Sequence, residues 1–266
     1  MKTHSGLIVS AICFLLALNL PGQNVKAPPD PDAPSAAQVA ELVLANHILA
    51  NEGVIDAYGH VSVRSEKNPN HFLLARHLPG GVVTAADILE YDLNTKPVHE
   101  TSVVGYSERF IHGEIYKVRP DVKAVIHFHS PDVIPFTVTN VPLRPMIHMA
   151  GFLPETTPVF EIRNAGGITD MLIRTNELGH ALAMTLGDKP AVLMRGHGAV
   201  VVADSLHVAV GRAYYMGINA RTELQALQLG AGKVTFMEPE EAKKAAPQDG
   251  FERAWTYWRY KLQDKQ

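Results

Sequence analysis

The chain has 266 residues, of which 46% are hydrophobic, so it is long enough to bury a substantial core as one domain. Its formal net charge is −3, its pI is about 6.5, and no block of basic residues stands out, which argues against a nucleic-acid partner. The single cysteine, Cys13, lies in an apolar N-terminal segment. A processed chain would therefore contain no disulfide, no thiolate metal ligand and no cysteine nucleophile.

Residues 1–27 have the pattern of an export signal. A lysine and a histidine precede an apolar run over residues 7–20, which is too short for a membrane span, and a proline–glycine pair follows it. We therefore expect a signal peptide over residues 1–27, export to the periplasm or the extracellular space, and no other contact with a membrane. Cleavage after Ala27, cleavage after Gly22 and an uncleaved N-terminal anchor all remain open.

A proline-rich spacer over residues 28–35 precedes the expected domain, residues 36–266. Ser35 is a suitable N-cap for a helix over residues 36–52, in which apolar residues recur at helical spacing, and Gly53 is a suitable stop. Short apolar or alternating runs between turn residues predict three strands, at residues 60–64, 72–75 and 88–92. A short helical piece at residues 84–87 precedes the third strand.

The second half of the domain alternates helices with strands. Apolar periodicity predicts helices from Ser107 to Arg119, from Asn176 to Leu186, from Leu206 to Leu229 and over the aromatic tail at 251–260. Strands are expected at 124–128, 157–162 and 191–203, the last being a strand pair or one bulged strand with residues 195–199 inside it. Because several strands are joined by short turns, we expect an α/β fold: a three-layer α/β/α arrangement around a mixed, mostly antiparallel central sheet.

Two histidines, His127 and His129, lie two residues apart at the end of a predicted strand. Side chains in a strand alternate between its faces, so both imidazoles point the same way and can share one divalent cation. A catalytic metal usually takes three protein ligands and keeps a further position open. His197 is the candidate third ligand, because the glycines on both sides of it permit close approach of the backbone.

Glu108 is expected in the first turn of the helix that Ser107 caps. A carboxylate there interacts favourably with the helix dipole, so this position alone describes a stabilising arrangement without a catalytic role. His112 lies four residues later on the same helical face. It is either a supporting residue behind the site or a hydrogen-bonded core histidine.

Four pieces of the sequence, taken in order, resemble the class II aldolase/adducin family. They are Tyr58-Gly59-His60-Val61-Ser62-Val63-Arg64, Ser107-Glu108, His127 with His129, and Gly196-His197-Gly198. The resemblance covers most of residues 36–230. It implies the three-layer fold expected above and a homotetramer with active sites between subunits. It also implies that the C-terminal tail reaches a neighbouring subunit's site; a tail packed on its own core is the alternative.

The resemblance also implies roles for individual residues. His127, His129 and His197 would hold one divalent metal ion per subunit, and Glu108 would be the catalytic acid/base and a further ligand in the absence of substrate. Three neutral imidazoles leave the cation its full charge, so it can stabilise the negative oxygen that develops when a carbon–carbon bond breaks. Zinc is the first expectation for the metal, and manganese, iron and cobalt remain open because imidazole accepts all of them.

The expected substrate is a small molecule without a sugar phosphate. Sugar-phosphate members of the family hold the phosphate with a Gly-Asn pair, a Thr-Gly loop and two serines. This chain has Gly59-His60, Arg76 to Gly81, and Tyr106-Ser107 at those places. The difference indicates the branch of the family that decarboxylates hydroxylated aromatic or pyridine carboxylic acids. His60, Arg76 and Ser107 are candidate substrate-binding residues; otherwise His60 is a core histidine and Arg76 a surface arginine.

The leading hypothesis is a metal-dependent carbon–carbon lyase, either a decarboxylase or an aldolase. A sugar epimerase on the same scaffold is an alternative, because cleavage and reclosure of an aldol uses the same groups. A non-catalytic, adducin-like interaction module is another, although such modules lose the metal ligands that this chain retains. An exported metal-binding protein without turnover is the third.

Overall fold

A seven-stranded sheet runs through residues 33–263, the part of the chain that the computed structural model describes. The strands are β1 (His60–Arg64), β2 (His71–Ala75), β3 (Ile88–Asp92), β4 (Ala124–Phe128), β5 (Val159–Phe160), β6 (Ala191–Met194) and β7 (Gly198–Ala203). Their order is β3-β2-β1-β4-β7-β6-β5, and every neighbouring pair is antiparallel except β5 with β6. The expected mixed, mostly antiparallel sheet is confirmed. The predicted signal peptide lies outside the described residues.

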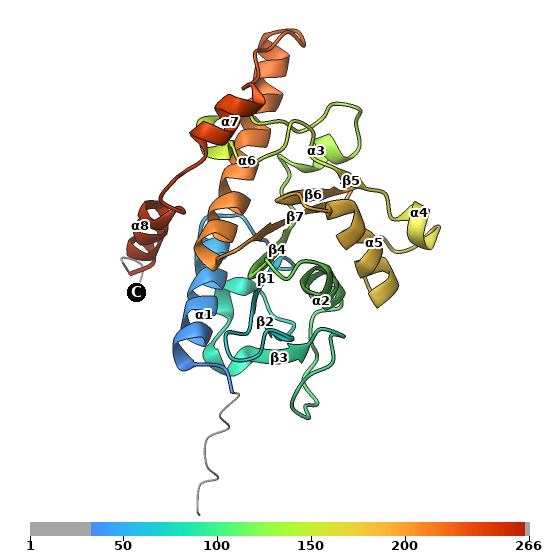
Figure 1. The fold of residues 1–266 in the computed structure, drawn as a ribbon, viewed down its shortest axis with the longest axis vertical. Helices are drawn as coiled ribbons and strands as arrows, with labels where there is room; N and C mark the ends of the chain where they lie inside the picture. The colour runs from blue at the N-terminus through green and yellow to red at the C-terminus, as the bar shows by residue number, and fades with distance from the viewer. Residues whose placement is uncertain (1–32, 264–266) are drawn as a thin grey trace, which may run out of the picture. The chain divides into compact units, whose positions relative to one another are not determined.

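Helices cover both faces of this sheet (Figure 1). They are α1 (Ala36–Asn51), α2 (Arg109–Val118), α3 (Ile134–Thr137), α4 (Arg163–Gly166), α5 (Asn176–Leu186), α6 (Leu206–Leu229), α7 (Pro239–Ala245) and α8 (Glu252–Gln263). One apolar core contains residues of α1, α6 and α8, and a second contains residues of α2 and α5. The three-layer α/β/α fold is confirmed.

The central strand β4 divides its side chains between the two cores. Ala124, Ile126 and Phe128 pack in the core on the α1 and α6 side, whereas Val125 packs in the core on the α2 and α5 side. This is the period-two alternation of an extended strand that is buried on both faces. His127 therefore lies on the same face of the sheet as Val125, which is the face that helix α2 covers.

Two of the predicted helices have the expected bounds and caps. The Ser35 hydroxyl accepts a hydrogen bond from the backbone N–H of Gln38 and begins α1, and Gly53 follows the helix with a φ of +68°. Helix α6 runs from Leu206 to Leu229, as the periodicity predicts.

The predicted N-cap of α2, Ser107, is wrong by one residue. The helix begins at Arg109, Glu108 occupies the N-cap position, and no side chain caps this end. Glu108 thus lies before the first turn, with its side chain free of the helix backbone. The Glu108 carboxylate makes its contacts in the site described below and not with the helix backbone. The prediction that a side chain caps this helix therefore fails.

The placement of His197 inside a strand is also wrong, and the alternative of a strand pair is confirmed. Residues 195–197 form a tight turn between β6 and β7, and Gly196 has a φ of +63°, which favours glycine. A Cβ atom on Gly198 would collide with the carbonyl oxygen of Phe128 in the neighbouring strand. The two glycines therefore serve the turn and the close strand contact that bring His197 beside the end of β4.

The strand expected at 157–162 is reduced to β5, two residues long. Pro158 has no N–H to donate to the sheet, and Glu161 accepts a hydrogen bond from the backbone of Arg163 where the chain turns into α4. Only Val159 and Phe160 remain to pair with β6.

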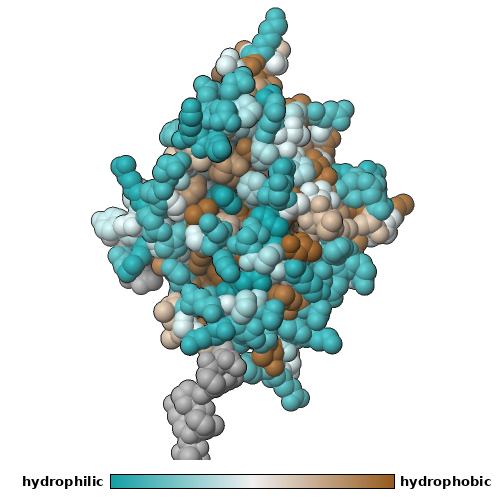
Figure 2. All heavy atoms as spheres, in the orientation of Figure 1, coloured by the Kyte–Doolittle hydropathy of each residue, from teal (hydrophilic) through white to brown (hydrophobic). Residues whose placement is uncertain are grey.

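The C-terminal tail packs on its own chain. Trp255 and Trp258 of α8 are buried in the core formed with α1 and α6, and His207 bonds to Glu41 and Glu252, which ties the three helices together. The alternative of a tail packed on its own core therefore describes these two tryptophans, and contact of the tail with a neighbouring subunit stays a prediction. None of the helices within residues 33–263 is long and apolar enough to cross a membrane. Hydrophilic residues predominate on the face drawn in Figure 2.

Candidate active site

Four side chains with metal-binding atoms meet at one end of the central strands. Glu108 stands before α2, His127 lies in β4, His129 follows β4, and His197 lies in the β6–β7 turn. One potential ligand atom from each lies within 4.8 Å of those of the other three. The structure thus brings together the four residues predicted from the sequence to hold the metal and perform acid/base chemistry.

The three imidazoles converge through the same ring atom. The Nε2 atom of His129 lies 3.0 Å from Nε2 of His127 and 3.1 Å from Nε2 of His197. The Oε2 atom of Glu108 lies 3.7 Å from Nε2 of His127 and 3.5 Å from Nε2 of His197. Four electron-donating atoms therefore surround one point.

The opposite nitrogen of each ring faces a hydrogen-bond acceptor. Nδ1 of His127 lies 3.1 Å from the carbonyl oxygen of Ala199, and Nδ1 of His197 lies 3.0 Å from that of Met171. Nδ1 of His129 lies 3.1 Å from Oδ1 of Asp56. Each Nδ1 must therefore carry the proton and donate it, which leaves each Nε2 with a free lone pair.

This donor set fits a divalent cation. Neutral Nε2 atoms without protons cannot hydrogen-bond to one another, so lone pairs about 3 Å apart repel unless a positive charge lies between them. Three imidazoles and a carboxylate are ligands that zinc and related transition metals accept. The fit rests on the fixed tautomers of the three rings as well as on the residue types.

The pKa shifts of Glu108 and His127 agree with metal binding, whereas the shift of His197 reflects the attraction of the nearby carboxylate for a positive charge. Burial lowers the pKa of His127 to about 3, so its ring is neutral. Burial opposes ionisation of Glu108, but its interactions with the His197 and His127 rings outweigh burial and lower the pKa of Glu108 to about 2. Burial likewise opposes protonation of His197, yet the Glu108 carboxylate raises the pKa of that ring. A carboxylate and neutral imidazoles are the forms that bind a cation.

A small cavity of about 140 Å³ opens beside this cluster. Two predicted substrate-binding residues, His60 and Ser107, line it together with Glu108 and His129. The remaining lining residues are Tyr58, His77, Tyr106 and Leu172. No lysine or arginine is among these described residues, so the side chains that can bind an anionic group beside Glu108 are imidazoles and hydroxyls.

Arg76 and His112 lie outside the lining of the cavity. Arg76 pairs with Asp87 at 2.6 Å, and its side chain is 40% exposed. His112 is fully buried and bonds to Nδ1 of His60 at 2.7 Å, so it stands directly behind a cavity residue. The prediction that His112 supports the site agrees with this contact; a substrate contact of Arg76 remains a prediction.

The sequence reasoning missed two elements of the site. Asp56 accepts hydrogen bonds from the backbone N–H groups of Tyr58 and Gly59 and also faces His129. An aspartate two and three residues before these N–H groups is a usual turn former, and this local signal masks its second role. The backbone N–H of Ile173 donates to Oε1 of Glu108 at 2.9 Å, and no side-chain pattern could have indicated it.

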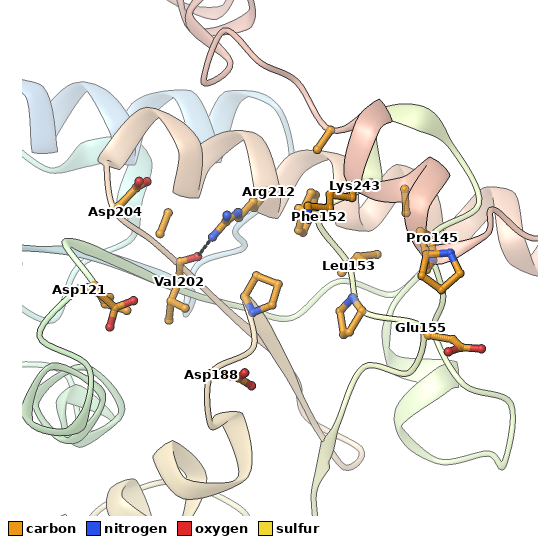
Figure 3. Close-up of a pocket in the computed structure, with 18 of the residues that line it drawn as sticks. Asp121, Pro145, Phe152, Leu153, Glu155, Asp188, Val202, Asp204, Arg212 and Lys243 are labelled. Carbon is orange, nitrogen blue, oxygen red and sulfur yellow. Dashed lines mark hydrogen bonds between the residues drawn. The ribbon is translucent and has the colours of Figure 1, made fainter.

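A larger cavity, of about 590 Å³, contains none of these residues (Figure 3). In this view Arg212 extends from α6 and donates to the carbonyl oxygen of Val202, near Phe152. Carboxylates surround the cavity, and one of them, Asp121, pairs with Arg119 at 2.7 Å. It has neither converging ligand atoms nor a carboxylate poised beside an imidazole cluster, so the smaller cavity is the candidate active site.

The three-layer fold and the histidine–glutamate cluster define a protein of the class II aldolase type. The family model described as the class II aldolase and adducin N-terminal domain matches residues 40–224, and the chain belongs to this family.

Curated relatives include two decarboxylases. The decarboxylase tropJ of Talaromyces stipitatus is 35% identical over 249 residues, which cover 85% of this chain and 94% of that protein. A 3,4-dihydroxyphthalate decarboxylase of Arthrobacter keyseri is 31% identical over 235 residues, covering 83% and 91% respectively.

Solved structures agree on the fold. An aldolase II superfamily protein from Pseudomonas syringae superposes with a TM-score of 0.72 at 21% identity, and the match covers 90% of this chain and 96% of that one.

Proposed function

We propose that the protein is a divalent-metal-dependent carbon–carbon lyase that decarboxylates a hydroxylated aromatic carboxylic acid. The observation that carries the proposal is the convergence of three Nε2 atoms and the Glu108 carboxylate beside a cavity. Two relatives that match this chain over most of their length are named decarboxylases, which supports the reaction type. Aldol cleavage is the second candidate, because it places charge on an oxygen in the same way.

His127, His129 and His197 would hold the cation. When bound, the cation supplies an electrophile that stabilises the negative oxygen developing as the carbon–carbon bond breaks. The ring carbon that bears the carboxylate must first gain a proton, which turns the substrate's hydroxyl oxygen into a carbonyl oxygen. The bond to the carboxyl carbon can then break: its electron pair passes through the ring to this oxygen, the ring becomes aromatic again, and carbon dioxide leaves.

Glu108 is placed to move that proton. Its Oε1 is held by the backbone N–H of Ile173, and its Oε2 faces the cluster and the cavity. With one oxygen fixed, the other can receive the hydroxyl proton of the substrate and return it to the ring carbon, so the carboxylate ends unchanged. Its N-cap position outside the helix leaves the side chain free for this task.

The substrate preference follows from what surrounds the cluster. The cavity lining contains His60, Ser107 and Tyr106 at places where sugar-phosphate members of the family bind a phosphate. Imidazole and phenol rings suit a flat aromatic substrate better than a dianionic phosphate, which usually meets several backbone N–H groups or cations. A screen should therefore include ortho-hydroxy aromatic acids and, as the second arm, short aldols.

We propose zinc as the metal, one per chain, with manganese, iron and cobalt as alternatives that imidazole ligands also accept. Elemental analysis of the protein purified without a metal-binding tag identifies the ion. No metal after supplementation would favour the adducin-like interaction module, and a full metal content without turnover of any substrate would favour the metal-binding protein.

We further propose export and a homotetramer. The apolar run at residues 7–20 supports export, and N-terminal sequencing of the protein from culture fractions tests it. Membership of a family whose enzymes are often oligomeric supports assembly. Light scattering during gel filtration measures the mass, and a value of one chain mass, 29.0 kDa, would contradict the tetramer.

The reaction is tested by following product formation from ortho-hydroxybenzoic acids by liquid chromatography. We expect loss of the carboxyl group with wild-type protein and a rate lower by about 10²- to 10⁴-fold with Glu108→Gln, which keeps the shape of the side chain. Turnover of aldols instead of acids would move the assignment to the aldolase, and epimerised sugars to the epimerase. Equal rates for wild type and Glu108→Gln would contradict the role of this carboxylate.

A further inference from the structure

A row of four buried polar side chains leads away from the cavity. His60 Nδ1 lies 2.7 Å from His112 Nε2, His112 Nδ1 lies 2.6 Å from Ser62 Oγ, and Ser62 Oγ lies 2.8 Å from Tyr116 Oη. Each of the four residues is at most 1% exposed. No step of the proposed reaction uses this row, and an all-polar row in an apolar core is costly unless every member is hydrogen-bonded.

The proton of Tyr116 sets the direction of the row. This phenol has two acceptors within reach: Ser62 Oγ at 2.8 Å and the carbonyl oxygen of Lys123 at 3.5 Å. The second distance is at the limit of a hydrogen bond, whereas the first is an ordinary hydrogen-bond distance. Tyr116 therefore donates to Ser62.

The remaining protons follow from this first one. Ser62 accepts from Tyr116, so its own hydrogen goes to Nδ1 of His112. A neutral imidazole has one N–H, so the proton of His112 is on Nε2 and points to Nδ1 of His60. Nδ1 of His60 thus accepts, and its single proton is on Nε2.

The Nε2–H of His60 is directed into the cavity. His60 lines the cavity, and its Nδ1 edge points to His112 in the core, so the cavity edge carries Nε2. Among the described residues no hydrogen bond of this nitrogen is found, and it faces the cavity. A ligand in the cavity can therefore accept a hydrogen bond from it.

We infer that His60 donates from Nε2 to the carboxylate of the substrate, and that Tyr116, Ser62 and His112 are positioning residues that fix this tautomer. The inference rests on the proposed decarboxylation for the identity of the acceptor. In this arrangement His60 binds the carboxylate that will leave as carbon dioxide, a contact that the metal ligands and Glu108 do not provide.

A neutral donor has a specific advantage for this reaction. The carboxylate is charged in the bound substrate but leaves as neutral carbon dioxide, so a cation there would stabilise the ground state more than the transition state and slow the step. Among the described residues that line the cavity there is no lysine or arginine, so no permanently cationic side chain meets the carboxylate there.

The first test compares two variants at His60 in the metal-loaded, full-length protein. His60→Gln retains a side-chain N–H donor, whereas His60→Leu has a similar volume and none. We expect His60→Leu to lose about 10- to 150-fold in kcat/KM, as for a hydrogen bond to a charged group, and His60→Gln to recover most of that loss. Metal content should equal that of wild type in both; equal kcat/KM in the two variants overturns the inference.

The second test reads the tautomer without turnover. Protein loaded with diamagnetic zinc and labelled with ¹⁵N-histidine should show His60 and His112 with the proton on Nε2, assigned by the signals that the two His→Gln variants lose. Tyr116→Phe removes the donor that sets the direction, so a population with the proton on Nδ1 of His60 should appear. A wild-type proton on Nδ1 of His60 overturns the inference.

The two tests separate this inference from the proposed reaction. If the tautomers are as stated and no acid is decarboxylated, the reaction assignment fails while the orientation of His60 stands. If acids are decarboxylated but the tautomer is reversed, the reaction stands and His60 does not bind the carboxylate as a donor.

Discussion

Two groups of histidines lie side by side on the same face of the sheet and behave differently. In the metal cluster, His127, His129 and His197 face one another through Nε2 at 3.0 and 3.1 Å. In the neighbouring pair, His60 and His112 are joined head to tail, Nδ1 to Nε2, at 2.7 Å. The two groups are in contact, because His60 and His127 are partners in the pairing of β1 with β4.

The difference lies in what the other ring nitrogen meets. Behind the metal cluster there are acceptors, two carbonyl oxygens and the Asp56 carboxylate, which force the proton to Nδ1 and expose three lone pairs. Behind His112 lies the Ser62 hydroxyl, which accepts a hydrogen bond from Tyr116 and donates its own hydrogen to Nδ1 of His112. The same residue type thus becomes a metal ligand or a hydrogen-bond donor according to the groups behind it.

The largest effect should come from removing a ring of the metal cluster. We expect His129→Ala to reduce the bound metal from about one equivalent per chain to less than about a tenth, because the two imidazoles and the carboxylate that remain bind the cation more weakly. Turnover should fall with the metal. Plasma mass spectrometry after gel filtration measures the content, and His71→Ala, a histidine outside the cluster, is the matched control.

Glu108→Gln should separate metal binding from chemistry. The three imidazoles are unchanged, so metal content should stay near one equivalent, whereas turnover should fall by about 10²- to 10⁴-fold through loss of the acid/base group. Steady-state rates and elemental analysis of the same preparation measure both. A variant that loses its metal together with its activity would instead make Glu108 an essential ligand.

Asp56→Asn tests the claim that the acceptor behind a ring decides its role. The amide can still receive the backbone N–H groups through its oxygen, but it no longer presents a carboxylate to Nδ1 of His129. We expect metal affinity to fall by about 10- to 100-fold, which competition with a chelating dye measures. Asp132→Asn, which disturbs an ion pair with Arg221 away from the cluster, should bind metal as wild type does.

The smallest effect is expected at Arg76, since the account assigns the carboxylate to His60. Arg76→Gln should change kcat/KM by less than about twofold and the melting temperature by no more than about 3 °C, as for a partly exposed ion pair. A loss comparable to that of His60→Leu would restore Arg76 as the carboxylate-binding residue. Arg174→Gln, another partly exposed paired arginine, is the control.

This stability effect should depend on pH in a defined direction. The hydrogen bonds from Thr84 and then from Arg76 lower the pKa of Asp87 from 3.8 to about 2. A carboxyl with a lowered folded-state pKa contributes stability above its ordinary value and loses it as the pH falls through the lowered one. The difference in melting temperature between wild type and Arg76→Gln should therefore be constant above about pH 5, decrease as the pH falls through 2, and vanish near about pH 1.

Residue spacing predicted the parts of the site that depend on periodicity. The i, i+2 pair His127 and His129 required only the alternation of a strand, and the glycines around His197 indicated a close approach. Apolar periodicity likewise predicted α1 and α6 to within a residue at each end. These inferences succeeded because each depends on a few neighbouring residues.

Other features depend on contacts between distant segments. Glu108 is held outside α2 by a backbone N–H from residue 173, and the β6–β7 turn could not be told from a bulged strand by composition. The direction of the His60 row depends on Tyr116, 56 positions further along the chain, and on its shorter distance to Ser62 than to the carbonyl of Lys123. Such relationships are set by packing and leave no local pattern.

Removal and return of the metal tests the central claim most directly. The wild-type protein is stripped with a chelator, and decarboxylation of an ortho-hydroxy aromatic acid is measured as zinc, manganese, iron or cobalt is added back in steps. The account predicts no turnover in the stripped protein and a rise that ends at about one equivalent per chain, with none in His129→Ala. Full turnover without metal would contradict it.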